Sequence, residues 1–207
     1  MFYLVRSPWW LKRLYPGRVW DIKSSANSIY LSFDDGPEPA ITSFVLDELA
    51  KYDAKATFFC IGKNVVQHPE LFGRILAEGH AVGNHSFDHL DGWKTKDAVY
   101  VDNVLKAKEY INSDLFRPPY GKLSRRQQKQ LAKLGFKTIM WNVLSGDFDE
   151  SLSPEQCCNN VINKAASGAV VVFHDSKKAS ERLSYSLPLV LKHFTEKGYR
   201  FDKISFQ

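Results

Sequence analysis

The chain has 207 residues, an ordinary content of apolar and charged side chains, and a formal net charge of +5. This length suffices for one domain with a large core. The mild positive charge favours anionic surroundings such as a cell-wall polymer or lipid headgroups, but it falls short of the basic footprint of a nucleic-acid-binding protein.

The first 28 residues contain no segment that resembles a secretion signal or a membrane span. The apolar run 1–5 stops at Arg6, whereas a signal peptide needs a longer apolar core and a membrane span needs roughly 20 apolar residues. Trp9, Trp10 and Leu14 lie among cations, a composition that also suits weak contact with a membrane surface. Packing on the protein itself is the commoner outcome, so we expect residues 1–28 to form an N-terminal extension packed on the domain.

From residue 29 onward, strand-like and helix-like segments alternate. Strands are predicted at 29–33, 55–59, 80–83, 115–117, 137–141, 169–173 and 199–204, and helices between them at 40–52, 64–78, 95–113, 124–134, 154–166 and 184–197. Such alternation predicts a parallel sheet with helices outside. The predicted fold is therefore α/β, a distorted, incomplete (β/α) barrel of about seven parallel strands, because a full eightfold barrel takes about 250 residues.

Charged and imidazole side chains follow five of the seven predicted strands. They are Asp34-Asp35, Asn84-His85 with His89, Arg117-Pro-Pro-Tyr120, Asp147, and His174-Asp175. In parallel α/β folds the chemistry collects at the carboxyl ends of the strands. This pattern, more than any single motif, indicates an active site.

The first of these groups follows the strand 29–33 directly. Neighbouring side chains on a regular strand point to opposite faces. Asp34 and Asp35 can therefore serve one site only if the strand is already turning, and Gly36-Pro37 supplies that turn. For Asp-Asp-Gly alone, a turn that caps the next helix is the commoner explanation.

His85 and His89 have the i, i+4 spacing that brings two imidazoles together if the segment forms one helical turn. Such a pair alone is more often structural. Two histidines with one carboxylate form a familiar catalytic metal site that leaves a position for water. We therefore predict Asp35, His85 and His89 as metal ligands. Zinc is the default, while the same set also suits iron or another divalent ion.

These motifs together resemble the polysaccharide deacetylases of the NodB-homology type, carbohydrate esterase family 4, over about residues 28–205. Ser32-Phe-Asp-Asp-Gly-Pro37 is similar to the first family motif, His85-Ser-Phe-Asp-His89 to the second and Arg117-Pro-Pro-Tyr120 to the third. Asp147 resembles the aspartate of the fourth motif, and Val172-Phe-His174 resembles the fifth.

The resemblance implies roles for the base and its surroundings. Asp34 would be the catalytic base, held by Arg117, and Asp35 would bind the metal with the two histidines. The third motif, Pro118 included, would build one wall of the substrate groove, and the backbone N–H of Tyr120 would help bind the oxyanion.

The resemblance also implies a general acid. His174 would be the general acid, paired with Asp147. Phe148 stands where the family often has Trp, and Val172 where it often has Leu; both would line the pocket for the acetyl methyl group and the sugar. Ser32 replaces the usual Thr.

Trp93 and Tyr120 are candidates for stacking on a sugar ring, although core packing is as frequent for either aromatic alone.

The expected function is that of a metal-dependent hydrolase that removes N-acetyl groups from an N-acetylated amino sugar polymer, peptidoglycan or chitin-like. It would use one divalent ion, zinc by default with cobalt, nickel or iron as alternatives, and act as a monomer without nucleic-acid partners. The rivals are a deacetylase of a small or lipid-linked amide and a non-catalytic carbohydrate-binding protein.

The cell compartment stays open at this point. The unpaired Cys60, Cys157 and Cys158 and the lack of a signal peptide suggest the cytoplasm. The family resemblance suggests the cell envelope.

Overall fold

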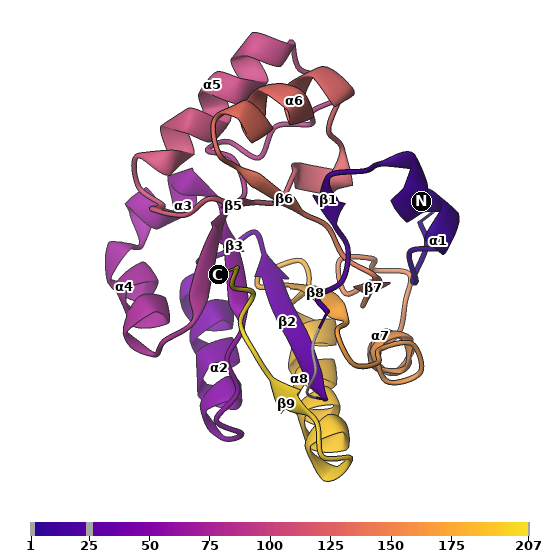
Figure 1. The fold of residues 1–207 in the computed structure, drawn as a ribbon. Helices are drawn as coiled ribbons and strands as arrows, with labels where there is room; N and C mark the ends of the chain where they lie inside the picture. The colour runs from indigo at the N-terminus through magenta and orange to yellow at the C-terminus, as the bar shows by residue number, and fades with distance from the viewer. Residues whose placement is uncertain (1–2, 24–26, 207) are drawn as a thin grey trace.

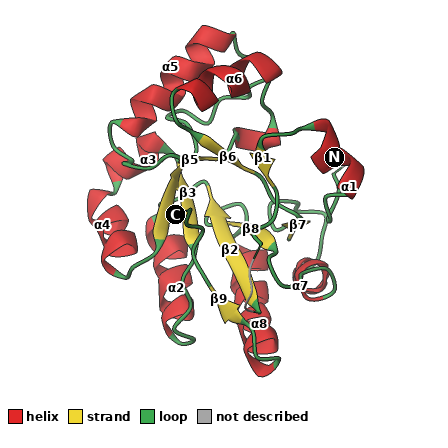
Figure 2. Ribbon diagram, in the orientation of Figure 1, coloured by secondary structure: helices red, strands yellow, loops and turns green. Residues whose placement is uncertain are grey.

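A computed structural model describes residues 3–23 and 27–206, and a curved sheet with outer helices runs through it (Figures 1 and 2). The strands are β1 (Arg18–Val19), β2 (Ser28–Asp34), β3 (Thr57–Cys60), β4 (Ala81–Asn84), β5 (Leu115–Phe116), β6 (Lys137–Ile139), β7 (Val143–Leu144), β8 (Val170–His174) and β9 (Arg200–Phe201). The helices are α1 (Trp9–Leu14), α2 (Pro39–Ala50), α3 (Gly62–Gln67), α4 (Pro69–Ala77), α5 (Asp97–Lys108), α6 (Arg125–Lys133), α7 (Pro154–Ile162) and α8 (Ser180–Glu196), with a short 3₁₀ helix, η1, at Pro119–Gly121.

The strands pair in the order β1-β6-β5-β4-β3-β2-β8-β7, and β9 pairs with β2. All pairings between these strands are parallel. The sheet curls into an incomplete barrel, which confirms the predicted fold class. Strand β2 lies between β3 and β8, and its register places Asp34 opposite His174.

Each of the seven predicted strands is present, with ends that differ by at most three residues, whereas β1 and β7 were not predicted. These two strands have two residues each, too few to show an alternating pattern. The helix predicted at 64–78 is instead two helices. It breaks at His68, because the residue before a proline is disfavoured in helical conformation, and Pro69 starts α4.

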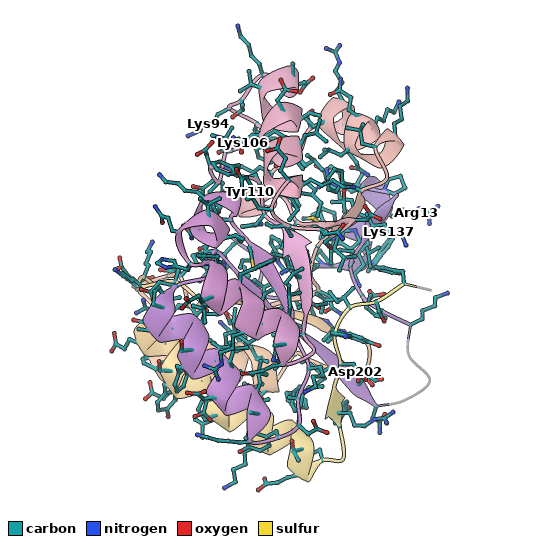
Figure 3. The ribbon with its side chains drawn as sticks, turned by 90° about the vertical axis from the view of Figure 1, so that its left-hand side faces the viewer. Arg13, Lys94, Lys106, Tyr110, Lys137 and Asp202 are labelled. Atoms are coloured by element: carbon teal, nitrogen blue, oxygen red, sulfur yellow. The ribbon has the colours of Figure 1, made fainter. Side chains whose placement is uncertain are left out.

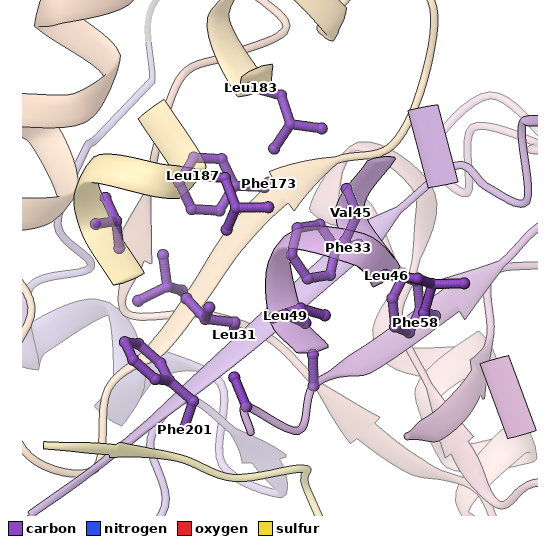
Figure 4. Close-up of a cluster of buried hydrophobic side chains, with 14 of the residues drawn as sticks. Leu31, Phe33, Val45, Leu46, Leu49, Phe58, Phe173, Leu183, Leu187 and Phe201 are labelled. Carbon is purple, nitrogen blue, oxygen red and sulfur yellow. The ribbon is translucent and has the colours of Figure 1, made fainter. Parts of the chain in front are cut away.

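The main core lies between the sheet and the helices α2 and α8 (Figure 4). Phe33 of β2 is fully buried at its centre and stacks on Phe58 of β3 and Phe173 of β8, with ring centroids 5.1 and 6.2 Å away. Leu46 from α2 and Leu187 from α8 complete this cluster. The strand that ends in Asp34 is therefore anchored on both sides before it reaches the site.

The N-terminal segment runs along β7 and then along β6. Arg6 forms an antiparallel bridge with Val143, and the Leu144 N–H donates to the Val5 carbonyl at 2.8 Å. Helix α1 between these contacts leaves Trp9 and Trp10 74% and 48% exposed. Among the described residues, no helix is both long and apolar enough to cross a membrane.

Substitution of Phe33 tests how far the site depends on this core. Phe33→Ala removes a fully buried ring and should lower the free energy of unfolding by about 3–5 kcal/mol. Val99→Ala, at a position that is 53% exposed on α5, should change it by less than about 0.5 kcal/mol. Chemical denaturation of both variants measures the difference, and equal effects would contradict this description of the core.

Candidate active site

The polar residues predicted at strand ends meet at one end of the barrel. Asp34 ends β2, and Asp35 follows it; His85 follows β4, Arg117 follows β5, and His174 ends β8. Hydrogen bonds and short contacts link these groups across the strands, as described below. The structure thus brings together the predicted base, ligand set and acid.

Asp34 is held by a buried ion pair. The Arg117 Nη1 donates to Asp34 Oδ1 at 2.7 Å and to Ser32 Oγ at 2.8 Å, and the guanidinium is fully buried. Its other nitrogens donate to the backbone carbonyls of Ile139 and Met140, and Phe59 lies against its face at 4.0 Å. These contacts fix the Asp34 carboxylate in one position.

Asp35 turns toward the same side because its backbone leaves the strand conformation. Its φ is 83°, which only a minority of non-glycine residues adopt. The side-chain amide of Asn64 donates to the Asp35 carbonyl at 2.7 Å and the Gly36 carbonyl accepts from the Ile61 N–H. The predicted turn therefore exists, and it directs two adjacent carboxylates into one site.

The carboxylate of Asp35 faces two imidazoles. Its Oδ1 lies 3.2 Å from His89 Nε2 and 3.7 Å from His85 Nε2, and one ligand atom from each residue lies within 4.8 Å of the others. This Oδ1 is buried yet forms no hydrogen bond with the described residues. An unsatisfied buried oxygen between two imidazole nitrogens is the arrangement that a bound cation would satisfy.

The protonation of His85 also suits a metal ligand. Its Nδ1 lies 2.8 Å from the Arg117 carbonyl, which makes Nδ1 the donor and leaves the Nε2 lone pair free. Burial lowers the pKa of His85 to about 4, so the ring is neutral at neutral pH. Burial opposes the charge on Asp35, but the imidazoles of His89, His174 and His85 lower its pKa below the ordinary value. The residues present fit a divalent cation.

The segment 85–89 does not form a helical turn, the condition under which i, i+4 spacing would bring the two imidazoles together. Ser86 and His89 have φ values of 60° and 57°, so an irregular loop brings the imidazoles together, with ring centroids 5.1 Å apart. Asn103 of α5 accepts hydrogen bonds from the Phe87 and Asp88 N–H groups. Lys106 and Tyr110, labelled in Figure 3, contact the Phe87 ring. Side chains from α5 and the residues just after it therefore hold the loop from outside.

His174 is oriented by Asp147, which is fully buried after β7. His174 Nδ1 lies 2.8 Å from Asp147 Oδ1, and the His174 N–H donates to Asp147 Oδ2 at 2.7 Å. Burial alone would lower the pKa of His174, but the charge of Asp147 outweighs it and raises the pKa to about 9. His174 is therefore a protonated imidazolium at neutral pH.

Asp175 has a structural role that the sequence did not reveal. Its buried carboxylate accepts from the Gly36 N–H at 3.0 Å and from the Thr42 hydroxyl at 2.5 Å. A Cβ atom on Gly36 would lie 2.0 Å from Asp175 Oδ2, so only glycine fits there. Burial raises the pKa of Asp175 to about 8. This side chain ties the turn after Asp35 to the end of β8.

Aromatic side chains lie around the rim. Tyr120, with φ 59° and 56% exposed, packs edge-on against His89 at 4.6 Å. Lys122 Nζ lies 5.4 Å from the Tyr120 ring and 5.7 Å from the ring of Trp93, which is 66% exposed. The two aromatics proposed for sugar stacking thus flank one cation.

The other predicted substrate contacts lie deeper. Phe148 packs edge-on against His174, with ring centroids 5.1 Å apart. Val172 is only 1% exposed on β8, and Pro118 is buried before η1. Of the predicted substrate contacts, Phe148 therefore packs against the proposed acid, whereas Val172 and Pro118 are buried.

Comparison with known proteins identifies the family of the chain. The family model described as polysaccharide deacetylase matches residues 21–139. The chain is 33% identical over 193 residues to a peptidoglycan-N-acetylglucosamine deacetylase of Bacillus cereus, covering 90% of this chain and 91% of that protein. The chain belongs to the polysaccharide deacetylase family. The predicted family and enzyme class are thereby confirmed.

A second relative and a solved structure are also similar to the chain. A chitooligosaccharide deacetylase of Bradyrhizobium is 36% identical over 168 residues, which cover 78% of this chain and 76% of the relative. The crystal structure of the Bc1960 peptidoglycan N-acetylglucosamine deacetylase superposes with a TM-score of 0.87 at 27% identity, covering 96% of this chain and 95% of the other. Some relatives are much longer, and the chain spans 38% of the Listeria monocytogenes peptidoglycan-N-acetylglucosamine deacetylase.

Metal analysis of purified variants tests the ligand set. His89→Ala and Asp35→Ala each remove one of the three candidate ligand atoms and should abolish stoichiometric binding of zinc. Asp34→Asn keeps an oxygen for Arg117 and should retain one metal per chain. Metal content measured by mass spectrometry distinguishes the two aspartates, and loss of metal in Asp34→Asn alone would mean that their roles are reversed.

The pKa of His174 predicts a pH dependence of stability in the metal-free protein. Because the folded pKa of about 9 lies above the ordinary 6.5, the stabilising effect is complete below pH 6.5 and disappears as the pH rises through 9. The stability advantage of wild type over His174→Gln should therefore shrink across this range, by at most about 3 kcal/mol. Denaturation curves between pH 6 and 10 measure it, and a constant difference would contradict the Asp147–His174 ion pair.

Proposed function

We propose that this protein is a divalent-cation-dependent hydrolase that removes the acetyl group from N-acetylglucosamine units of a glycan, peptidoglycan or chitin-like. The observation that carries the proposal is the register of β2 and β8, which sets Asp34 opposite His174 with the Asp35, His85 and His89 cluster beside them. The named activities of the relatives, on peptidoglycan and on chitooligosaccharides, support the substrate class.

Asp35, His85 and His89 would hold the cation. When bound there, a divalent ion supplies Lewis acidity, which polarises a carbonyl group and makes water more acidic. Zinc suits two imidazoles and one carboxylate, and cobalt, nickel and iron are the alternatives. The remaining chemistry belongs to the side chains around this cluster.

Asp34 is the proposed general base. Its ion pair with Arg117 keeps one carboxylate oxygen occupied and the group oriented. The carboxylate takes the proton of the water that attacks the acetyl carbonyl carbon. Because Arg117 is fixed by two backbone carbonyls as well, the base moves little during the reaction.

Tyr120 and His174 are the groups proposed to act on the oxyanion and on the leaving amine. The backbone N–H of Tyr120 is the proposed donor to the oxyanion, and loss of one such donor typically costs about 10²–10³ in rate. His174 donates its Nε2 proton to the nitrogen as the C–N bond breaks, because an amide anion is a very poor leaving group. Asp147 keeps that proton available by holding the pKa of His174 at about 9. The products are acetate and a free amino sugar.

The exposed aromatics suit a sugar polymer better than a small amide. Trp93 and Tyr120 are both more than half exposed, Lys122 lies over both rings, and Tyr120 packs against the proposed ligand His89. Stacking on sugar rings at this rim would bind units next to the one that reacts. A complete set of base, ligands and acid also argues against a protein that only binds carbohydrate.

Acetate release by matched variants tests the proposal. In zinc-loaded protein with chitooligosaccharides or peptidoglycan fragments as substrate, Asp34→Asn and His174→Ala should each lower kcat by about 10²–10⁴-fold, since each removes a general acid or base. Both variants should keep their metal. Asp114→Asn, at an exposed aspartate paired with Lys108, is the matched control and should retain full activity.

The substrate panel decides between the proposal and its rivals. A lipid-linked N-acetylated amino sugar is assayed beside the two polymers, and a strong preference for it would identify the alternative substrate class. Failure of the metal-loaded wild type to release acetate from any of these substrates would overturn the hydrolase proposal.

A further inference from the structure

The N-terminal segment reaches the active site through Tyr3. The segment pairs with β7 through Arg6 and Val143, and β7 leads directly into the loop 145–149 that carries Asp147. Tyr3 lies beside the far end of this loop. Its hydroxyl donates to Asp149 Oδ2 at 2.9 Å, and its ring packs on Phe148 with centroids 5.2 Å apart.

Phe148 connects Tyr3 to the reacting groups. One side of its ring faces Tyr3, and it packs edge-on against the His174 imidazole at 5.1 Å. The three rings therefore form a row that runs from the N-terminal segment to the proposed acid. Asp147 fixes the Nδ1 side of His174, and Phe148 contacts its ring from a second direction.

The loop leaves little freedom at the Tyr3 hydroxyl. A Cβ atom on Gly146 would lie 3.1 Å from that oxygen, and Gly146 has φ 81°. The acceptor Asp149 is itself fixed, because its Oδ1 accepts from the backbone N–H and the hydroxyl of Ser151. Burial and the Asp149 carboxylate raise the pKa of Tyr3, so the hydroxyl stays neutral and keeps donating.

We infer that Tyr3 is a positioning residue of the active site, which holds Phe148 against His174 and so keeps the general acid aligned with the leaving nitrogen. The inference rests on the proposed function, because it assigns His174 as the acid. Tyr3 itself does not touch the reacting atoms. Its effect passes through Phe148, and it makes the N-terminal segment part of the catalytic apparatus.

Steady-state kinetics with a chitooligosaccharide test this role. Tyr3→Ala should lower kcat about tenfold and change KM less than twofold, because alignment of the acid matters in the transition state and not in substrate binding. Tyr3→Phe keeps the ring on Phe148 and should restore kcat to within about threefold of wild type. Tyr15→Ala is the matched control, since this tyrosine of the same segment packs on Arg18 instead.

A double-mutant cycle shows whether the effect passes through Phe148. Phe148→Ala alone should lower kcat at least as much as Tyr3→Ala, and the double variant should be no slower than Phe148→Ala. Additive effects would overturn the inference, as would an unchanged kcat in folded Tyr3→Ala. If Tyr3→Ala does not fold, Tyr3→Leu replaces it in the same cycle.

A spectroscopic measurement separates this inference from the proposed function. The NMR signal of the His174 Cε1 proton senses the Phe148 ring in the absence of any substrate. It should shift in Tyr3→Ala and stay in place in Tyr3→Phe and Tyr15→Ala. If the signal shifts in Tyr3→Ala but wild type releases no acetate, the contact between Tyr3, Phe148 and His174 stands and the hydrolase proposal is rejected. If wild type is active but the signal does not shift in Tyr3→Ala, the role of Tyr3 is rejected.

Discussion

The geometry of the site depends on one buried, positively charged side chain, that of Arg117. The Arg117 guanidinium is removed from water and is satisfied by Asp34, Ser32 and two backbone carbonyls at the end of β6. Burial lowers the pKa of this side chain, while the carboxylate of Asp34 counteracts the effect. An unpaired buried charge destabilises a fold by several kcal/mol. The ion pair between Arg117 and Asp34 therefore both neutralises the buried charge and positions the proposed base.

A second constraint is the backbone around the ligand cluster. Asp35, Ser86, His89 and Tyr120 all have positive φ, although none is glycine. Such conformations cost of order 1 kcal/mol or more and persist where surrounding contacts enforce them. For Asp35, Ser86 and His89 the enforcing contacts come from Asn64, Asn103 and Asp175, which bind the backbone at or near these residues. These loops of the site are thus held by polar side chains on α3, on α5 and directly after β8.

The sequence was sufficient for the fold class and for the groups that converge, because strand–helix alternation and polar residues at strand ends are local patterns. It left the conformation of the loop 85–89 open, since i, i+4 spacing carries no information on a left-handed Ser86. It missed Tyr3, and it placed Asp175 at a strand end without identifying its partners. The partners of these two residues lie 146 and 133 residues away in the chain, and no local pattern signals such contacts.

The central place of β2 has a consequence for the life of the nascent protein. This early strand is flanked by β3, which is synthesised soon after it, and by β8, which comes about two-thirds of the chain later. Contacts so distant in sequence form late, after their loop-closure entropy can be offset. Asp34 therefore has no His174 opposite it until at least 174 of the 207 residues have been synthesised. A shorter nascent chain carries the proposed base and metal ligands without the proposed acid.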